Sequence, residues 1–265
     1  AGIAMKMRQL GIIRKPMFVV PKPVAAQWGK EFNKFFPAAK LLVPVESDYG
    51  TSGRKTYINK IVSNDYDAVI MSYEMFESIP LSPAAQKAFF EEQMDEAVEA
   101  LKEMKADEDA ENTGYSRRGS GKTDHSVKQM EKYIEQIKVR IEKLDAKNAR
   151  DVDNVEFETL GVDGLFVDEA HNFKSLRVST HLQNVAGINT ASESGRAFDL
   201  LSKVRYLQGV NDGRGIVFAT ATPVMNTMGE LFVMQKYLAP ELMKDRGIYN
   251  FDAWAKQFGQ VTNKL

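Results

Sequence analysis

The feature that most constrains this chain is a short apolar run, residues 164–167, that leads directly into two neighbouring carboxylates, Asp168 and Glu169. Ala170 and His171 follow them. A buried strand of a parallel sheet is typically such a short apolar run, and the ligand sites of open α/β sheets lie at the carboxyl ends of their strands. The sequence therefore predicts two adjacent acids at a ligand-binding edge of a parallel sheet.

An acid pair in that position is suited to metal-assisted hydrolysis of a nucleotide. One carboxylate can hold Mg²⁺, often through water, while a second group orients the attacking water. On this interpretation one of the two acids holds the metal and a second group orients the water. The competing interpretation is a strand end that carries two acids as exposed turns often do, and a second motif further along the chain favours the first one.

The rest of the chain predicts the sheet that such a site needs. Apolar runs that read as buried strands alternate with amphipathic segments of helical periodicity. The runs are residues 16–21, 41–45, 67–73 and 215–219, and the helical segments are residues 1–10, 24–36, 194–207 and 228–238. Such alternation favours a parallel sheet with helices on its faces. In residues 24–36 the expected apolar stripe comprises Val24, Trp28, Phe32 and Phe35.

Residues 82–150 interrupt the alternation with two heptad patterns. The first pattern comprises Phe90, Met94, Ala97, Leu101 and Met104, and the second comprises Val127, Met130, Ile134, Ile137, Ile141 and Leu144. Residues 86–111 are rich in acids and residues 117–150 in bases, so the two segments are expected to pair with each other as an antiparallel helical hairpin. The expected division is therefore an α/β domain in two parts, residues 1–81 and 151–265, with the hairpin inserted between them.

The second motif is Thr220-Ala221-Thr222, at the end of the predicted strand 215–219. Hydroxyl groups at that strand end can hydrogen-bond His171 or Glu169 and report whether the phosphate site is occupied. A run rich in threonine also has simple β-propensity, which is the alternative interpretation.

The Asp-Glu-Ala-His box and the Thr-Ala-Thr motif resemble those of superfamily 2 helicases and translocases. Residues 220–240, with Pro223, Asn226, Glu230 and Leu231, resemble the Swi/Snf-related branch of that superfamily. The resemblance implies the first RecA-like motor domain of a DNA-dependent ATPase that uses ATP and Mg²⁺ and moves along double-stranded DNA. It also implies that Asp168 holds the Mg²⁺ and that Glu169 polarises the water. By the same resemblance, His171, Thr220, Ala221 and Thr222 couple the nucleotide state to the DNA site.

Two further stretches resemble the DNA-contacting motifs of the same branch. Pro21 and Lys22 stand at a strand-to-helix turn, where free N–H groups and a positive charge suit a DNA phosphate. Trp28 and Phe32, in the helix that follows, also read as ordinary core residues. Ser72, in the sequence Ser-Tyr-Glu at the end of the predicted strand 67–73, is the third candidate for DNA binding.

The phosphate-binding glycine loop of this superfamily has no match in the sequence. The nearest pattern, Gly-Lys-Thr at residues 121–123, has Ser116 where the loop requires glycine, and no apolar strand precedes it. The expected fold is thus an α/β, parallel-sheet, RecA-like P-loop NTPase domain that lacks its first strand and P-loop. We expect the segment alone to be inactive, because it also lacks the second RecA-like domain that completes such a site.

Composition limits the other possibilities. The net charge of −1 excludes a generally basic nucleic-acid coat, so DNA must be contacted locally. The absence of cysteine excludes disulfides and thiolate metal sites and fits a reducing, cytoplasmic compartment. No apolar run approaches the ~18 residues of a membrane span, so no membrane partner is expected.

Residues 65–70, 76–82 and 160–176 further resemble very large mobile-element proteins in which such a motor is fused to an adenine methyltransferase. That resemblance implies a second motor domain and a methyltransferase domain as partners within one polypeptide, although no methyltransferase motif occurs here. Two alternatives remain open from the sequence. The chain could be a non-catalytic interaction module that displays the hairpin, or an accessory subunit that binds DNA regardless of nucleotide.

Overall fold

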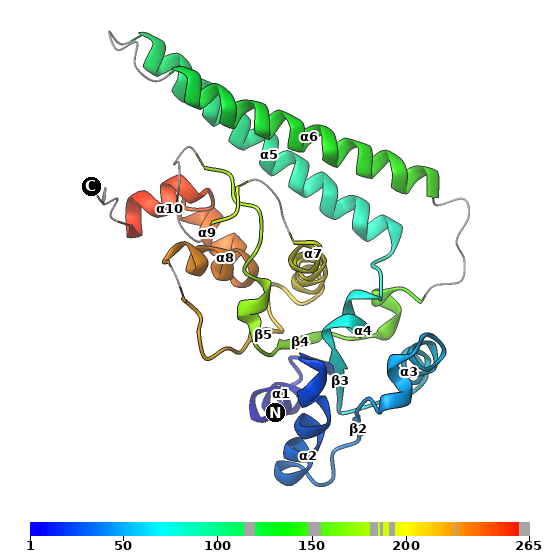
Figure 1. Cartoon of the computed structure of the whole chain (residues 1–265). Helices are drawn as coiled ribbons and strands as arrows, with labels where there is room; N and C mark the ends of the chain where they lie inside the picture. The colour runs from blue at the N-terminus through cyan, green and yellow to red at the C-terminus, as the bar shows by residue number, and fades with distance from the viewer. Residues whose placement is uncertain are drawn as a thin grey trace. The chain divides into compact units, whose positions relative to one another are not determined.

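The structure is a computed structural model that describes residues 1–113, 120–147, 155–180, 185, 188–190, 194–225 and 227–259 (Figure 1). The chain forms two compact units, each assembled from separate segments. Unit 1 comprises Ala1–Ser82, Val152–Phe173 and Gly195–Pro223. Unit 2 comprises Pro83–Asp151, Lys174–Ser194 and Val224–Leu265.

Unit 1 contains a sheet of five strands in the order β2-β3-β1-β4-β5. The strands are β1 (Pro16–Val20), β2 (Leu41–Leu42), β3 (Ala68–Ser72), β4 (Gly164–Val167) and β5 (Ile216–Phe218). Every pairing is parallel, with Phe18 opposite Ile70 on one side and Phe166 on the other. The predicted α/β, RecA-like parallel sheet is therefore confirmed.

Helices α1 (Gly2–Gln9) and α2 (Ala25–Phe35) cover one face of this sheet. Phe18 and Phe166 stack on that face with their ring centroids 4.8 Å apart, and Phe32 of α2 meets Phe18 edge-on. Helix α7 (Gly195–Val210) lies on the opposite side of the sheet (Figure 1). Burial on both faces explains why the strands read as continuous apolar runs rather than as alternating ones.

The remaining helical segments of unit 1 connect these strands. They are η1 (Lys22–Val24), η2 (Glu46–Tyr49), α3 (Thr51–Ser63), α4 (Tyr73–Glu77), η3 (Phe157–Leu160) and η4 (Ala170–Phe173). One detail of α2 differs from the predicted stripe: Phe35 is 73% exposed, whereas Phe36 packs against the core. The prediction for Phe35 was wrong: positions 35 and 36 both follow Phe32 at a spacing that can share its face, and Phe36, at the end of the helix, takes the place beside Phe32.

The end of α1 depends on a residue that can adopt a left-handed conformation. Gly11 has φ +70°, and its N–H donates to the carbonyl of Arg8 at 2.9 Å. We expect Gly11→Ala to lower the unfolding free energy of unit 1 by about 1–2 kcal/mol, because a Cβ is disfavoured in that conformation. Denaturant unfolding measured by Trp28 fluorescence in a Trp254→Phe background tests this, since Trp28 lies in unit 1.

Gly2→Ala is the matched control for this substitution. Gly2 lies in the same helix with ordinary backbone angles, and the space that an added methyl group would occupy is open. Its replacement should leave stability unchanged or slightly raised. Equal losses for the two variants would show that the left-handed turn at Gly11 is not the cause.

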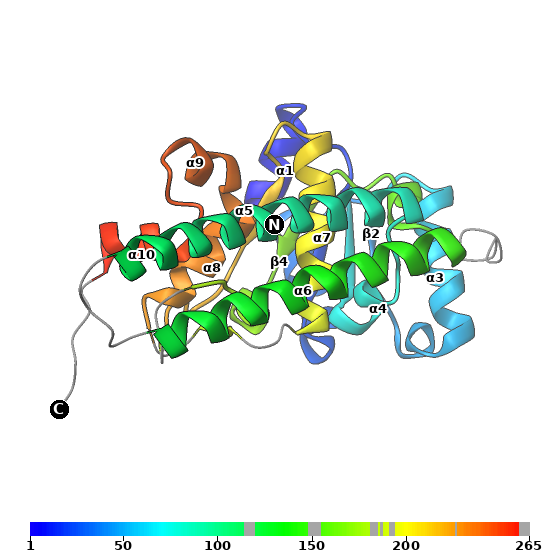
Figure 2. The ribbon, with the colours of Figure 1, turned by 90° about the horizontal axis from the view of Figure 1, so that it is seen from above.

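Unit 2 is built on a hairpin of two long helices, α5 (Pro83–Thr113) and α6 (Ser120–Lys147). The helices run side by side in opposite directions, as Figures 1 and 2 show. Ala97 of α5 forms a buried cluster with Val127, Met130 and Ile134 of α6. Lys105 pairs with Glu131 at 2.8 Å, and Arg140 lies over the ring of Phe90. Residues late in α5 thus face residues early in α6, and residues early in α5 face residues late in α6, as the antiparallel prediction requires.

Three shorter helices complete unit 2: α8 (Gly229–Leu238), α9 (Pro240–Asp245) and α10 (Phe251–Phe258). Acids of α5 pair with this group. Glu96 lies 3.6 Å from Lys236 and accepts a hydrogen bond from Tyr249, and Glu92 lies 3.9 Å from Lys244. The acids of α5 therefore also form contacts outside the hairpin, whereas charge patterning alone had predicted that they pair with α6.

The Gly-Lys-Thr pattern lies at the start of the second hairpin helix, α6. Residues 120–123 of the Gly-Lys-Thr pattern form the first turn of α6, and Gly119 lies outside the described residues. None of the helices in the described part of the chain combines the length and apolar character that a membrane span requires.

Candidate functional site

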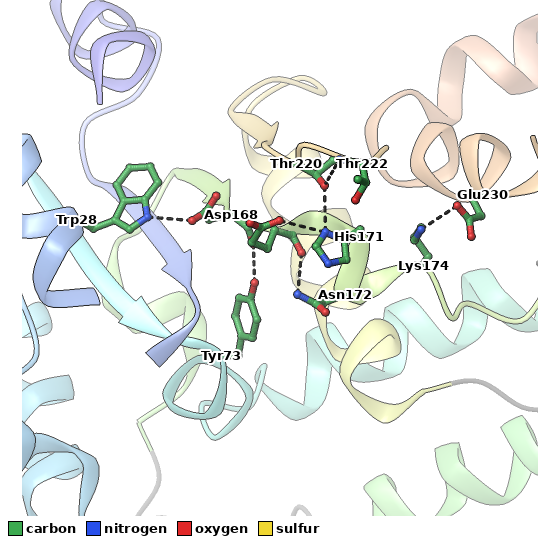
Figure 3. A network of polar contacts seen from close by, with 10 residues as sticks. Trp28, Tyr73, Asp168, His171, Asn172, Lys174, Thr220, Thr222 and Glu230 are labelled. Carbon is green, nitrogen blue, oxygen red and sulfur yellow. Dashed lines mark hydrogen bonds and ion pairs between the residues drawn. The ribbon is translucent and has the colours of Figure 1, made fainter. Parts of the chain in front are cut away.

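The acid pair and the Thr-Ala-Thr motif lie together at the carboxyl ends of β4 and β5 in unit 1 (Figure 3). The main chain fixes this arrangement, because the Asp168 N–H donates to Val19 of β1 and the Ala170 N–H donates to Ala219 after β5. Nδ1 of His171 lies 3.1 Å from Thr220 Oγ1 and 3.1 Å from Glu169 Oε2. The strand ends thus bring residues about fifty positions apart into direct contact.

These contacts form a continuous polar chain from one strand end to the other. The Thr222 N–H donates to Thr220 Oγ1 at 3.1 Å, and Thr220 in turn contacts His171. An imidazole nitrogen accepts a hydrogen bond when it lacks a proton and donates when it carries one. Nδ1 of His171 can therefore accept from Thr220 or donate to the Glu169 carboxylate, and a change of tautomer would exchange one contact for the other. Ala221 is exposed on the same turn.

The backbone of Glu169 is in the left-handed region, with φ +47°. That conformation is uncommon for a residue with a side chain, and it persists where surrounding contacts hold it. Here the carbonyl of Glu169 accepts from the N–H of Asn172 at 3.0 Å and from its side-chain amide at 3.1 Å. The turn consequently directs the Glu169 side chain, which is 43% exposed, toward His171.

Asp168 is held by two aromatic donors. The indole Nε1 of Trp28 donates to Asp168 Oδ2 at 2.9 Å, and the hydroxyl of Tyr73 donates to the main-chain oxygen of Asp168 at 2.6 Å. Burial raises the pKa of Tyr73 to about 12, so its hydroxyl stays protonated at neutral pH. Sequence patterning classed Trp28 with the core and named Tyr73 only as part of a motif, because neither has a spacing that predicts contact with Asp168.

A buried ion pair fixes the helix that carries Tyr73. Lys203 of α7 is fully buried, and its Nζ donates to the carbonyl of Phe76 at 2.8 Å and pairs with Asp199 at 2.7 Å. Burial lowers the pKa of Lys203 and raises the pKa of Asp199. Arg196 of the same helix also pairs with Glu77 of α4. Helix α7 therefore anchors α4 and, through it, the position of Tyr73.

The residues present fit a magnesium ion that arrives with a phosphate ligand. Among the described residues no group of three or more His, Cys, Asp or Glu side chains is placed to hold a metal alone. Mg²⁺ at phosphoryl-transfer sites, however, uses one or two carboxylates together with phosphate oxygens and water. The half-buried Asp168 carboxylate keeps lone pairs beyond the one that accepts from Trp28, so it can serve as such a ligand.

The residues expected to contact DNA lie at the ends of β1 and β3. Lys22 is exposed after β1, 3.3 Å from Glu46 and over the ring of Tyr49, and it borders an open pocket of about 460 Å³. Pro21 precedes it at the start of η1. Ser72 is fully buried, and its Oγ accepts from the Met75 N–H at the start of α4. Its hydroxyl is thus used within the fold.

Part of the predicted signature after Thr222 lies in unit 2. Glu230 of α8 is buried, pairs with Lys174 at 2.8 Å and accepts from the Met225 N–H at 2.6 Å (Figure 3). Asn226 lies outside the described residues. Glu230 therefore fixes the segment that enters α8, a local structural role within its own unit.

Comparison with known proteins assigns a family to this arrangement. A protein-family model described as "Probable helicase domain" matches residues 2–265. The chain belongs to this probable helicase domain family. The helicase domain is also 28% identical over 209 residues to the protein named "Defense against restriction protein B" of Escherichia phage P1. That match covers 77% of the present chain and 8% of the phage protein, so the helicase domain spans a small part of this relative.

Proposed function

We propose that this helicase domain is the first motor domain of a DNA-dependent ATPase of the DEAH-box type, in the Swi/Snf-related branch. The observation that carries the proposal is the contact between Glu169, His171 and Thr220 at the carboxyl ends of neighbouring parallel strands. Ligands bind at that edge of an open α/β sheet. Membership of the helicase family supports nucleotide hydrolysis as the chemistry.

In the proposed reaction, Asp168 binds Mg²⁺ and Glu169 orients the water that attacks the terminal phosphate of ATP. The metal, when bound, neutralises charge on the phosphate oxygens. His171 and Thr220 respond to the state of Glu169, because all three share one set of contacts. Thr222, with Ala221 between them, connects this set to the exposed turn that follows β5. ATP and Mg²⁺ are therefore the proposed ligands of this site.

The proposal requires a phosphate-binding loop. We propose that the strand carrying this loop pairs with the outer edge of β5. In the described sheet β5 pairs with β4 alone, and its three residues are all partly exposed, whereas β1, β3 and β4 are fully buried. A strand as apolar as Ile216–Phe218 is typical of the interior of a parallel sheet. We propose that a further parallel strand of the same polypeptide pairs there and presents the loop toward Asp168.

The proposed DNA contacts are Pro21 and Lys22, at the turn that leads from β1 into α2. The exposed ammonium group of Lys22 stands at this turn, where a positive charge suits a phosphate of double-stranded DNA. The buried hydroxyl of Ser72 caps α4, so any contribution of Ser72 to DNA binding would come through the position of α4. We further propose that the domain is fused to a second motor domain and a methyltransferase domain in a protein of mobile-element origin. The three-part division at residues 81 and 150 and a cytoplasmic location are also proposals.

A steady-state ATPase assay with and without double-stranded DNA tests the proposed function. It compares the 265-residue chain with a longer chain of the same polypeptide that includes the phosphate loop and the second motor domain. We expect DNA-stimulated turnover from the longer chain and none from the 265 residues alone. Equal turnover by both, or none by either, would contradict the proposal.

The main alternative is a non-catalytic module whose function is to display the α5–α6 hairpin. The length of these two helices, 31 and 28 residues, favours a role in contacting a partner. Such a module would keep its partner binding after the acid pair is neutralised, whereas a motor would lose its ATP-driven function. Replacing Glu169 with Gln in the complete protein separates the two.

A further inference from the structure

The helix that follows the proposed DNA-contacting turn also reaches the proposed metal ligand. Helix α2 begins at Ala25, directly after η1, which contains Lys22. One turn into α2, Trp28 donates its indole N–H to Asp168 Oδ2 at 2.9 Å (Figure 3). A single short segment therefore connects the end of β1 to the carboxylate at the end of β4.

The ring of Trp28 is fixed by packing, so its N–H has a defined direction. Its centroid lies 5.4 Å from that of Phe18 on β1, and Phe18 stacks on Phe166 of β4. Tryptophan offers one donor and no acceptor, and a hydrogen bond to an ionised carboxylate is about twice as strong as one to a neutral acceptor. The bond therefore restrains the rotation of the Asp168 side chain.

The main chain at the same residue is restrained independently. Tyr73 donates to the Asp168 carbonyl at 2.6 Å, and that carbonyl belongs to the peptide that leads into Glu169 with its φ of +47°. Trp28 thus acts on the carboxylate of Asp168 and Tyr73 on its backbone. Because the two donors act on different atoms, their contributions can be separated by substitution.

We infer that Trp28 is a positioning residue for the metal-binding carboxylate, and that it links the Lys22 turn to the nucleotide site. This inference rests on the proposed function. Hydrogen-bond partners of metal ligands orient the ligand, and their loss typically lowers metal affinity by about 10–100-fold. A shift of α2 when Lys22 binds a DNA phosphate would move the indole N–H and so change the orientation of Asp168.

The test is Trp28→Phe in the complete protein, with metal binding as the first measurement. Mn²⁺ replaces Mg²⁺, and its dissociation constant is measured by electron paramagnetic resonance in the presence of a non-hydrolysable ATP analogue. We expect the constant to rise about 10–100-fold. DNA affinity without nucleotide should change less than about twofold, because Lys22 and its turn are retained.

The chain supplies a matched control in its other tryptophan. Trp254 donates its indole N–H to Gln235 Oε1 at 2.7 Å in unit 2, a neutral acceptor. Trp254→Phe should leave the Mn²⁺ constant unchanged.

If phenylalanine at position 28 disturbs folding, β-(3-benzothienyl)alanine keeps the bicyclic shape and lacks the N–H. An unchanged Mn²⁺ constant in a folded variant that lacks this N–H would overturn the inference. Asp168→Asn separates that result from failure of the proposed function. If Asp168→Asn abolishes Mn²⁺ binding while loss of the Trp28 N–H does not, only the role of Trp28 is wrong. If Asp168→Asn has no effect either, the proposed nucleotide site is wrong as well.

Discussion

Replacing Glu169 with Gln is expected to lower DNA-stimulated ATP hydrolysis by the complete protein by about 10²–10⁴-fold, the usual loss when a general base is removed. The amide keeps the size of the side chain and can still hydrogen-bond His171, but it cannot take a proton from water. Because Asp168 is unchanged, binding of ATP with Mg²⁺ should be retained. Phosphate release and equilibrium binding of a fluorescent ATP analogue measure the two properties separately.

Glu241→Gln provides the control for this change of charge. Glu241 lies on α9 in unit 2, is largely exposed and pairs with Lys244 at 3.1 Å, so its neutralisation should leave turnover unaffected. Turnover by Glu169→Gln that stays within a few fold of the unsubstituted protein would show that Glu169 does not orient the water. The interaction module would be favoured if neither the unsubstituted protein nor Glu169→Gln showed an ATP-driven function and both still bound a partner.

Replacing Lys203 with Met is expected to lower the unfolding free energy of unit 1 by about 3–5 kcal/mol, the typical cost of removing one partner of a buried ion pair. Lys203 is fully buried, and its loss leaves the partly buried Asp199 carboxylate without the ammonium at 2.7 Å. Denaturant unfolding of the 265-residue chain in the Trp254→Phe background measures the loss through Trp28 fluorescence.

The double variant Lys203→Met with Asp199→Leu separates the unpaired charge from lost packing. It removes both charges, and the Phe76 carbonyl still accepts from the Ile79 N–H at 3.2 Å. Replacement of a whole buried pair by apolar side chains is often nearly neutral, so most of the lost stability should return. A double variant as unstable as Lys203→Met alone would mean that the pair does not account for the effect.

The elements of the sheet could be predicted because burial on both faces leaves a direct mark on the sequence. The strands at Pro16–Val20 and Ala68–Ser72 are continuous apolar runs, and all five residues of each are buried. The strand expected at residues 41–45 is shorter, Leu41–Leu42. Pro44 has no N–H for a sheet hydrogen bond, and Val45 is 59% exposed.

The candidate site could be predicted only where its residues lie close in sequence or carry a motif. The acid pair and the threonines were identified in this way, and parallel pairing of β4 with β5 explains why they meet. The roles of Trp28 and Lys203 could not be predicted. Each depends on contacts between residues of different elements. Helical periodicity had placed Trp28 in the core and gave no role to Lys203.

The distance between bound Mg²⁺ and the Asp168 carboxylate tests the proposed site most directly. It can be measured in a crystal structure of the complete protein with a non-hydrolysable ATP analogue. We predict that Asp168 binds the metal directly or through one water, with the terminal phosphate facing Glu169. A nucleotide bound elsewhere, with no metal or water contact to Asp168 or Glu169, would contradict the assignment of a motor function to this domain.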